Sequence, residues 1–171
     1  MLVFDHGWHQ LAIALWLFGP VRRVFAWLGR TEIVPGIVMD APSTLVWEHE
    51  NGVRVVLDIT FAIDAFFRSS HYGGDERVEV TGSKGFVRCN RISACGLQEP
   101  SVVLYREGEI RAFHALDDAP PDAFDAMVER SVAFFRGDAA PLMDAAVARQ
   151  VLITLLAALE SDRVGAPIDV G

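Results

Sequence analysis

The sequence predicts an α+β domain: an open, mostly antiparallel sheet of five or six strands with helices on one face. Two observations support this fold class. Strand-like segments fill the middle of the chain, and apolar residues recur at helical spacing near both ends. With 171 residues, 51% of them apolar, the chain can bury a core, and a single domain over residues 1–171 is expected from this length.

The first predicted element is a helix over residues 5–18, in "DHGWHQLAIALWLF". Its apolar residues cover nearly the whole circumference, so burial on most sides is expected. Gly19 and Pro20 are typical of a helix end. At the start of this helix, Asp5 and His9 stand four residues apart, a spacing that places both on one face.

A β-hairpin is predicted around Asn51-Gly52, because both residues tolerate the positive φ of a type I′ turn. In its second arm, residues 53–62, wholly apolar positions alternate with a mixed set, as expected for a strand with one buried face. Four further strand-like segments, separated by turn signals, are typical of an antiparallel meander: "ERVEVTG", "GFVRC", "SVVLYR" and "EIRAFHA".

Helical spacing returns near the C-terminus, over residues 121–137 and again over residues 140–162. In the first of these helices one stripe is largely apolar. Pro141 suits the first turn of the last helix, and Gly165 follows its end.

Composition and charge exclude several classes of function. A net charge of −8 argues against nucleic acid as a partner, because binding to phosphates relies on clustered cations. Lys84 is the only lysine. Cys89 and Cys95 have the spacing of neither a metal knuckle nor a disulfide framework, so reduced thiols and no metal are expected. The start of the chain lacks the features of a secretion signal and no apolar run is of membrane-spanning length, so we expect a cytoplasmic protein that does not enter the membrane.

Three segments, in order, resemble the C-terminal domain of the Gfo/Idh/MocA oxidoreductases, the glucose-fructose oxidoreductase and inositol dehydrogenase family. "DHGWH" is similar to the D-x-G-x-H helix start of that family, and "EVTGSKG" to its turn after a central strand. The closing segment "FFRGDAAPLMDAAVARQVLITLLAALESDRVGAPIDV" is similar to its final helix and Pro-x-x-Val end. The likeness covers nearly the whole chain.

This resemblance implies an enzyme of two parts. A Rossmann domain binds NAD or NADP, and the C-terminal domain supplies the sheet, the oligomer contacts and part of a site for a sugar, polyol or related hydroxy compound. By position His9 is the acid/base, Asp5 its neighbour, and Gly7 leaves room for substrate. Trp8, which could wall a pocket, and a polar loop with His71 and Tyr72 are candidate substrate contacts.

The chain also departs from the family pattern. None of its glycines forms a G-x-G-x-x-G motif, so a Rossmann domain is expected to be missing or separate, and the chain alone to be inactive. No E-K-P motif is present, and Ala12 stands where the family often carries an acid. These departures favour an alternative, a non-enzymatic dimerisation or binding module that kept the fold.

Structural interpretations remain open for each candidate residue. Asp5 is a good N-cap for the first helix, and His9 could be a core histidine bonded to a carbonyl. His6 and His9 alone are weak evidence for a metal. His71 and Tyr72 suit a solvated loop, and a cofactor-free lyase or isomerase using the Asp5 and His9 pair is the third alternative.

The mixed face of the predicted sheet requires a partner. We expect Val56, Trp47 and phenylalanines on the face away from the helices, where they would form an exposed apolar patch in a monomer. A self-complementary two-fold contact is the commonest solution, so a homodimer through the open sheet face is predicted.

Overall fold

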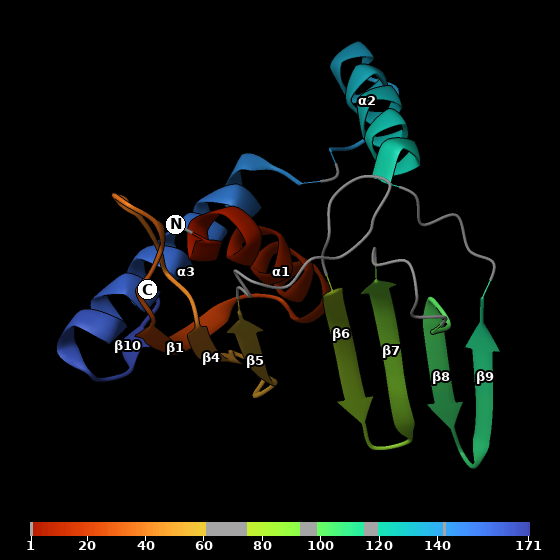
Figure 1. Ribbon diagram of the computed structural model, residues 1–171. Coiled ribbons are helices and arrows are strands. Elements are labelled where there is room, and N and C mark those ends of the chain that lie inside the picture. The colour runs from red at the N-terminus through yellow and green to blue at the C-terminus, as the bar shows by residue number, and fades with distance from the viewer. Residues whose placement is uncertain (1, 61–74, 93–98, 115–119, 142) are drawn as a thin grey trace. The chain divides into compact units, whose positions relative to one another are not determined.

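Backbone contacts divide the chain into two compact units (Figure 1), Met1–Ile63 with Leu142–Gly171, and Asp64–Pro141. The first unit thus joins the two ends of the chain. The assignment of residues 1–171 to one domain stays a prediction. The computed structural model describes residues 2–60, 75–92, 99–114, 120–141 and 143–171.

The first unit is built on a four-stranded antiparallel sheet with the strand order β10–β1–β4–β5. Helices α1 and α3 pack on each other, with α3 against β1 and α1 against β5 (Figure 1). Strands β2 and β3 form a separate two-stranded ribbon. The elements are α1 (Leu2–Phe18), β1 (Val21–Leu28), β2 (Thr31–Val34), β3 (Ile37–Met39), β4 (Ser43–His49), β5 (Arg54–Ile59), α3 (Ala145–Val164) and β10 (Ile168–Asp169).

Side chains of β4 alternate between the helix layer and the open face of this sheet. Leu45 and Trp47 are buried in the core with Val24 of β1, and Trp47 is only 3% exposed. The expectation that Trp47 lies on the open face with Val56 is therefore wrong. Trp47 is paired with Val55, and a residue shares its sheet face with its cross-strand partner.

Helix α1 begins earlier than predicted, at Leu2, and ends as predicted at Phe18. Gly19 adopts a φ of 80°, and its amide donates to the Leu15 carbonyl at 2.9 Å, which closes the last turn. Asp5 lies within the first turn, so the N-cap interpretation of Asp5 is wrong.

Helix α1 is buried on one side only, which corrects the expectation of burial on most sides. Val3, Leu11 and Leu15 face the core, whereas Trp16 is 78% exposed and Leu17 is 45% exposed. The sequence pattern could not separate these sides, because both are apolar. Only the neighbours of the helix decide which apolar side is covered.

The hairpin at Asn51-Gly52 is confirmed, but its turn is not type I′. The amide of His49 donates to the Val53 carbonyl, and the Gly52 amide donates to the His49 carbonyl at 2.9 Å. Gly52 alone has a positive φ, 85°. This is the three-residue loop in which a type I turn precedes a left-handed glycine. The Asn51 side chain favours it, because Oδ1 accepts from the Val53 amide and Nδ2 donates to the Phe18 carbonyl.

The last helix, α3, begins later than predicted. Asp144 is its N-cap and accepts from the Val147 amide at 2.9 Å, so Pro141 precedes the helix and is not in its first turn. Gly165 ends it in the left-handed conformation, as predicted, and its amide donates to the Ser161 carbonyl.

The second unit contains the predicted meander, in which each strand pairs with the next along the chain. Helix α2 follows and exposes Phe124, Val128 and Phe135 of its predicted apolar stripe. The elements are β6 (Asp75–Gly82), β7 (Gly85–Ile92), β8 (Val102–Arg106), β9 (Glu109–Phe113) and α2 (Pro120–Arg136).

The α+β class is confirmed, but the single sheet of five or six strands is wrong. The described strands form two four-stranded sheets and the β2–β3 ribbon. Short turns fix which strands pair within each hairpin, whereas the long connection from β5 to β6 fixes no pairing, so sequence order alone could not place that boundary. Within the residues described, no helix has the length and apolar character needed to cross a bilayer.

Candidate functional site

Asp5 and His9 share one side of α1, as their spacing predicts, and the structure shows that this side is exposed. The Asp5 side chain is 79% exposed. In the described part of the chain, neither a hydrogen bond nor an ion pair engages the His9 ring. Both imidazole nitrogens of His9 are therefore available to a bound molecule.

The ionisable side chain that lies beside Asp5 is that of His6 rather than that of His9. Asp5 Oδ2 lies 3.7 Å from His6 Nε2, and both side chains are exposed. Such a surface pair contributes little to stability. The structure thus gathers Asp5, His6 and His9 on one turn of helix, without joining Asp5 to His9.

Gly7 lies on the opposite, buried side of α1. A Cβ at this position would come within 3.8 Å of Leu57 and Ile59 of β5, which is ordinary contact. Gly7 therefore takes part in packing the helix on the sheet, and its role beside a substrate stays a prediction. Trp8 is half-buried against the core.

His71 and Tyr72 lie outside the described residues. Their assignment as substrate contacts stays a prediction.

The exposed side of α1 changes character along its length. Asp5, His6 and His9 occupy its first half, and Ile13, Trp16 and Leu17 its second, where Ile13 is 41% exposed. Contiguous exposed apolar side chains of this kind are typical of a surface that another molecule covers. The polar and apolar halves together form a surface suited to a polar reactant beside a protein contact.

The start of α1 is fixed by Asp40, a residue that the sequence analysis missed. Asp40 follows β3, is 9% exposed, and its Oδ2 accepts a hydrogen bond from the Val3 amide at 3.0 Å. Asp40 thus caps α1 from 37 residues away in sequence. An acid between a strand and a proline was the only local signal.

His49 is the histidine that is sealed inside the protein. Its ring is fully buried and lies edge-on to Phe18. Nε2 accepts from the Trp47 indole at 3.0 Å, and Nδ1 lies 2.7 Å from the Gly19 carbonyl oxygen. An indole only donates and a carbonyl only accepts, so His49 is a neutral ring with its proton on Nδ1. His49 has a structural role, whereas His9 is open to solvent.

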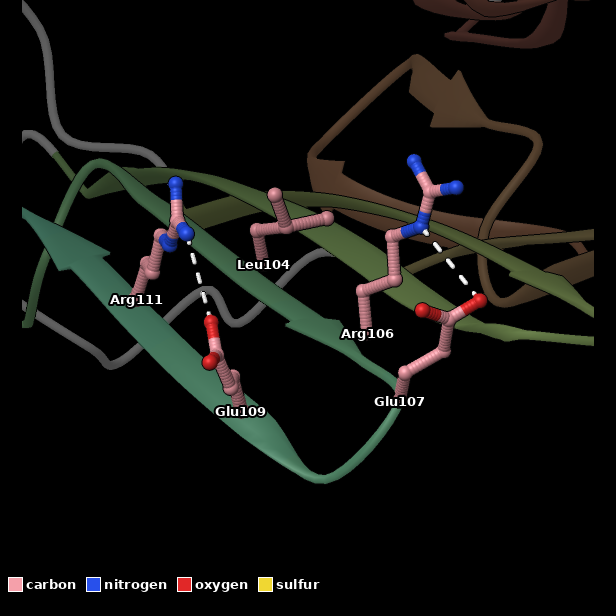
Figure 2. Close-up of a pocket in the computed structure, with 5 residues that line it drawn as sticks. All are labelled: Leu104, Arg106, Glu107, Glu109 and Arg111. Carbon is pink, nitrogen blue, oxygen red and sulfur yellow. Dashed lines mark hydrogen bonds and ion pairs between the residues drawn. The ribbon is translucent and has the colours of Figure 1, made fainter.

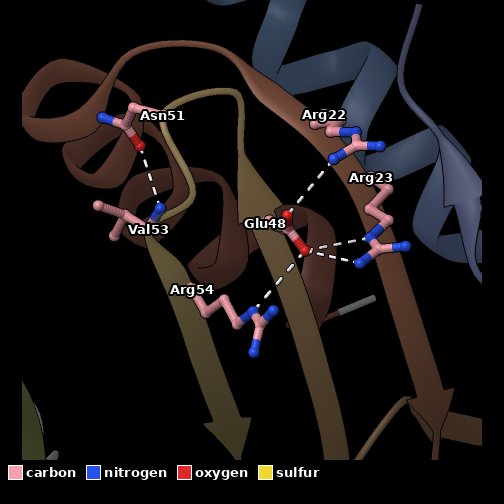
Figure 3. Close-up of polar contacts among 6 residues, drawn as sticks. All are labelled: Arg22, Arg23, Glu48, Asn51, Val53 and Arg54. Carbon is pink, nitrogen blue, oxygen red and sulfur yellow. Dashed lines mark hydrogen bonds and ion pairs between the residues drawn. The ribbon is translucent and has the colours of Figure 1, made fainter.

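A cluster of charged side chains lies on the open face of the first unit, where three arginines surround Glu48 (Figure 3). Arg23 Nη2 donates to Glu48 Oε2 at 2.7 Å, and Arg22 and Arg54 lie within 3.7 Å of the carboxylate. The hydrogen bond from Arg23, followed by the charges of all three arginines, lowers the pKa of Glu48. Glu48 is therefore a firmly ionised anchor for a cationic cluster.

Three concavities lined by described residues lie away from His9, and two of them contain ionisable groups of both signs. One, in the second unit, has a volume of about 400 Å³ and is lined by the β8–β9 hairpin (Figure 2). There Arg111 pairs with Glu109 at 3.2 Å and Arg106 with Glu107 at 4.0 Å, all of them exposed. Another, of about 320 Å³ in the first unit, is lined by Asp40, by five residues of β1, β3 and α3, and by Gly29 and Arg30, which follow β1.

Comparison with known families now identifies the chain. Residues 1–88 match the model of the GFO/IDH/MocA C-terminal domain. The chain belongs to this family. The Asp5–His9 segment, the Asp40 cap and strands β1, β4 and β5 all lie within the matched residues, whereas β10 lies outside them.

Solved structures show the same fold at low sequence identity. The WlbA dehydrogenase from Bordetella pertussis, solved with NADH and UDP-GlcNAcA, is 18% identical, with a TM-score of 0.66 over 99% of this chain and 45% of that one. An oxidoreductase from Agrobacterium radiobacter, solved with NAD+, L-tartaric acid and magnesium, is 17% identical, with a TM-score of 0.68 over 99% of this chain and 49% of that one.

An NAD binding oxidoreductase from Klebsiella pneumoniae is 18% identical, with a TM-score of 0.65 over 96% of this chain and 49% of that one. The GFO/IDH/MocA-type chain described here thus spans about half the length of these structures. A comparison with the curated proteins gives no match.

The described residues of this GFO/IDH/MocA domain do not fit the pyrophosphate of a dinucleotide. A phosphate binds at a helix start through free backbone amides. At α1 the Val3 amide is engaged by the Asp40 carboxylate, and at α3 the Val147 amide is engaged by Asp144. Both carboxylates would repel phosphate, and α2 begins with two prolines, which have no amide hydrogen. Nor do the described residues gather three potential metal ligands anywhere.

Proposed function

We propose that this chain is the substrate-binding and oligomerisation part of an NAD(P)-dependent oxidoreductase that acts on a sugar, a polyol or a related hydroxy compound. His9 is the acid/base of this proposal. The single observation that carries it is the exposed His9 ring on α1, with neither nitrogen engaged by another described residue, in a family of oxidoreductase domains.

The chemistry assigned to His9 follows from its side chain. Oxidation of an alcohol requires a base for the hydroxyl proton, and a histidine that titrates near neutral pH both accepts and returns that proton. Asp5 lies one helical turn away, where its charge favours the protonated ring that forms. Trp8, His71 and Tyr72 complete the proposed substrate contacts.

The dinucleotide belongs to a domain outside this chain in our proposal. The carboxylates that cap the starts of α1 and α3 leave no site for the pyrophosphate of the dinucleotide at these helices. The exposed apolar half of α1, with Ile13, Trp16 and Leu17, is a suitable surface for the dinucleotide-binding domain. The isolated chain is therefore expected to be inactive. A cytoplasmic location accompanies this proposal as a prediction from the sequence.

The same proposal includes a homodimer through the open face of the first unit. Val56 is 63% exposed and Trp27 is 60% exposed on this face, next to Phe25. A face with large apolar side chains is costly to leave in water, and a two-fold contact covers it on both copies. A strict monomer by sedimentation at micromolar concentration would contradict this part of the proposal.

The catalytic proposal is tested by joining the chain to the dinucleotide-binding domain of a structurally similar dehydrogenase. We expect hydride transfer from polyols or sugar acids in the fusion and none in the chain alone. His9→Ala should lower kcat by about 10²- to 10⁴-fold, as loss of a general base does. His6→Ala, which removes an exposed imidazole one turn away, is the matched control and should leave kcat unchanged.

Either of two results would overturn the catalytic proposal. Hydride transfer by the isolated chain would show that this chain itself contains a dinucleotide site. Equal activity of the His9→Ala and His6→Ala fusions would remove His9 from the chemistry. Titration of the isolated chain with the same polyols, followed through the NMR signals of the His9 ring, gives a readout that does not depend on turnover.

The second candidate function is a non-enzymatic dimerisation or binding module. Ala12 favours it, because this position often carries an acid in the family, whereas here it is only 7% exposed and packs in the core. A module of this kind would dimerise normally and show no response of His9 to any hydroxy compound. The His9 titration therefore separates the two candidates.

A further inference from the structure

One cavity of the first unit takes no part in the proposed function. It lies where β1 ends, beside β3 and α3, and has a volume of about 320 Å³. Small-molecule sites have volumes of ~300–1,000 Å³ and combine a mostly apolar lining with a few polar groups. This cavity has the size and the mixed lining of such a site.

Hydrogen bonds fix the walls of this cavity. Asp162 Oδ1 of α3 accepts from the Leu28 amide at 2.8 Å, which ties the end of α3 to the end of β1. The Gly29 amide donates to Ser43 Oγ at 3.1 Å, and Ser43 Oγ donates to the Asp40 carbonyl at 2.8 Å. These two bonds tie the residue after β1 to the segment between β3 and β4. A cavity held in shape by its own hydrogen bonds loses little entropy when it binds a ligand.

The acidic side of the cavity is formed by Asp162 and Asp40. Asp162 Oδ1 is engaged by the Leu28 amide, whereas no residue within the described ranges donates to Oδ2. Asp40 is only 9% exposed and adds a second carboxylate to the lining, with its Oδ2 engaged by the Val3 amide. Carboxylate oxygens only accept hydrogen bonds and an ammonium group only donates them. This side of the cavity therefore suits an ammonium group.

Arg30 supplies the opposite charge from the loop after β1. It lines the same cavity as Asp40 and Asp162, yet within the described part of the chain its guanidinium forms neither an ion pair nor a hydrogen bond. Arg23 and Arg163, by contrast, each pair with a glutamate. A guanidinium presents a planar fork of donors that matches the two oxygens of a carboxylate. Arg30 therefore suits the carboxylate of a ligand.

The rest of the lining is mainly apolar. Leu28 of β1, Val38 and Met39 of β3, and Leu159 of α3 contribute it. Val38 is 47% exposed, so a ligand that covers it removes apolar surface from water. A ligand with an apolar side chain gains this contribution, whereas a purely polar ligand does not.

We propose that this cavity binds a free α-amino acid with an apolar side chain. The carboxylate of the amino acid pairs with the Arg30 guanidinium, and its ammonium group pairs with the Asp162 carboxylate. Its side chain packs on Val38, Met39 and Leu159. A simple anion or a simple cation satisfies only one of the two charged groups, whereas a zwitterion satisfies both. This inference does not depend on the proposed oxidoreductase activity.

Titration of the full chain with L-leucine tests the site, with affinity measured by calorimetry and the position of the ligand by backbone amide NMR signals. We expect saturable binding, with the largest shifts at the amides of Leu28, Gly29 and Met39. L-leucinamide lacks the carboxylate, and isocaproate lacks the ammonium group. Each should bind about tenfold more weakly or worse, because each loses one charge-assisted contact. Glycine, which lacks the apolar side chain, should also bind more weakly.

Two substitutions assign the charged contacts. Arg30→Gln should weaken leucine binding about tenfold or more and change leucinamide binding little, because leucinamide has no carboxylate. Asp162→Asn keeps an oxygen for the Leu28 amide but removes the negative charge. It should weaken leucine binding similarly and change isocaproate binding little.

The matched control is Arg163→Gln, which removes the next side chain of α3 after Asp162. Arg163 pairs with Glu160 and is not part of the cavity lining, so leucine binding should stay unchanged. Thermal unfolding verifies the fold of every variant. Arg30 is exposed and bonds no residue in the described ranges, so Arg30→Gln keeps the test decisive if Asp162→Asn does not fold.

Three results would overturn the inference. If neither leucine nor another apolar amino acid binds at millimolar concentration, the cavity is not an amino acid site. If isocaproate or leucinamide binds as tightly as leucine, only one charged group is used and the ligand is not a zwitterion. If Arg30→Gln and Arg163→Gln bind leucine equally well, the amino acid lies elsewhere on the chain. These measurements require neither a dinucleotide nor turnover, so failure here is distinct from failure of the catalytic proposal.

Discussion

The indole nitrogen of Trp47 donates a hydrogen bond to Nε2 of His49, 3.0 Å away, between the sheet and the helices. The other ring nitrogen of His49 bonds the Gly19 carbonyl, where α1 ends. One buried ring thus ties β4, an inner strand of the sheet, to the turn after α1. This contact contributes to holding α1, and with it His9, in place.

His49→Phe should destabilise the first unit. The substitution keeps a ring of similar size but leaves the Trp47 N–H and the Gly19 carbonyl without partners, at a cost of about 1–3 kcal/mol for each group left unsatisfied. Urea unfolding followed by Trp fluorescence measures the change. His9→Phe, the same replacement at an exposed position, should stay within about 0.5 kcal/mol. Equal effects at both positions would show that the buried hydrogen bonds contribute nothing.

Asp40→Ala should loosen the start of α1. The Asp40 carboxylate accepts from the Val3 amide inside a covered site, and loss of such a cap costs about 1–2 kcal/mol. Hydrogen exchange of the first-turn amides is the direct measurement, and faster exchange is expected there. Asp5→Ala removes an exposed acid from the same turn and serves as the control. Unchanged exchange in Asp40→Ala would mean that another group caps the helix.

Glu48 should make stability depend on pH in the acid range. Its pKa in the folded protein lies below the usual 4.5, chiefly because Arg23 donates a hydrogen bond to it. A lowered folded pKa contributes stability that is complete above the unfolded value and is lost as the pH falls through the folded one. The stability difference between wild type and Glu48→Gln should therefore be constant near neutral pH and shrink below about pH 4.5. A difference that stays constant down to pH 3 would contradict this assignment.

Local signals predicted the ends of elements well. Gly19 ends α1, Gly165 ends α3, and Asn51-Gly52 forms the hairpin loop, because each depends on a few neighbouring residues whose backbone preferences are strong. That Asp5 and His9 share one helix face also followed from their spacing, but the exposure of that face did not.

Contacts between distant segments could not be predicted in this way. Asp40 caps a helix 37 residues earlier in the chain, and Trp47 faces the core because of its register with β5. Both depend on which strands pair, and alternation within one strand does not say which of its faces is covered. For the same reason the sequence did not separate the two sheets.

Gly85 begins β7, next to the backbone of β8, and its replacement should destabilise the second unit. A Cβ built on Gly85 would collide with the Tyr105 carbonyl oxygen, a backbone atom that cannot move aside without disturbing the β7–β8 pairing. Gly85→Ala should therefore cost more than about 1 kcal/mol, as overpacking does. Gly82, at the other end of the same turn, has only the Gly85 carbonyl oxygen at 4.0 Å, so Gly82→Ala is the matched control and should be nearly neutral. Thermal unfolding compares the two, and a Gly85→Ala protein as stable as Gly82→Ala would show that β7 and β8 are less closely paired than their register implies.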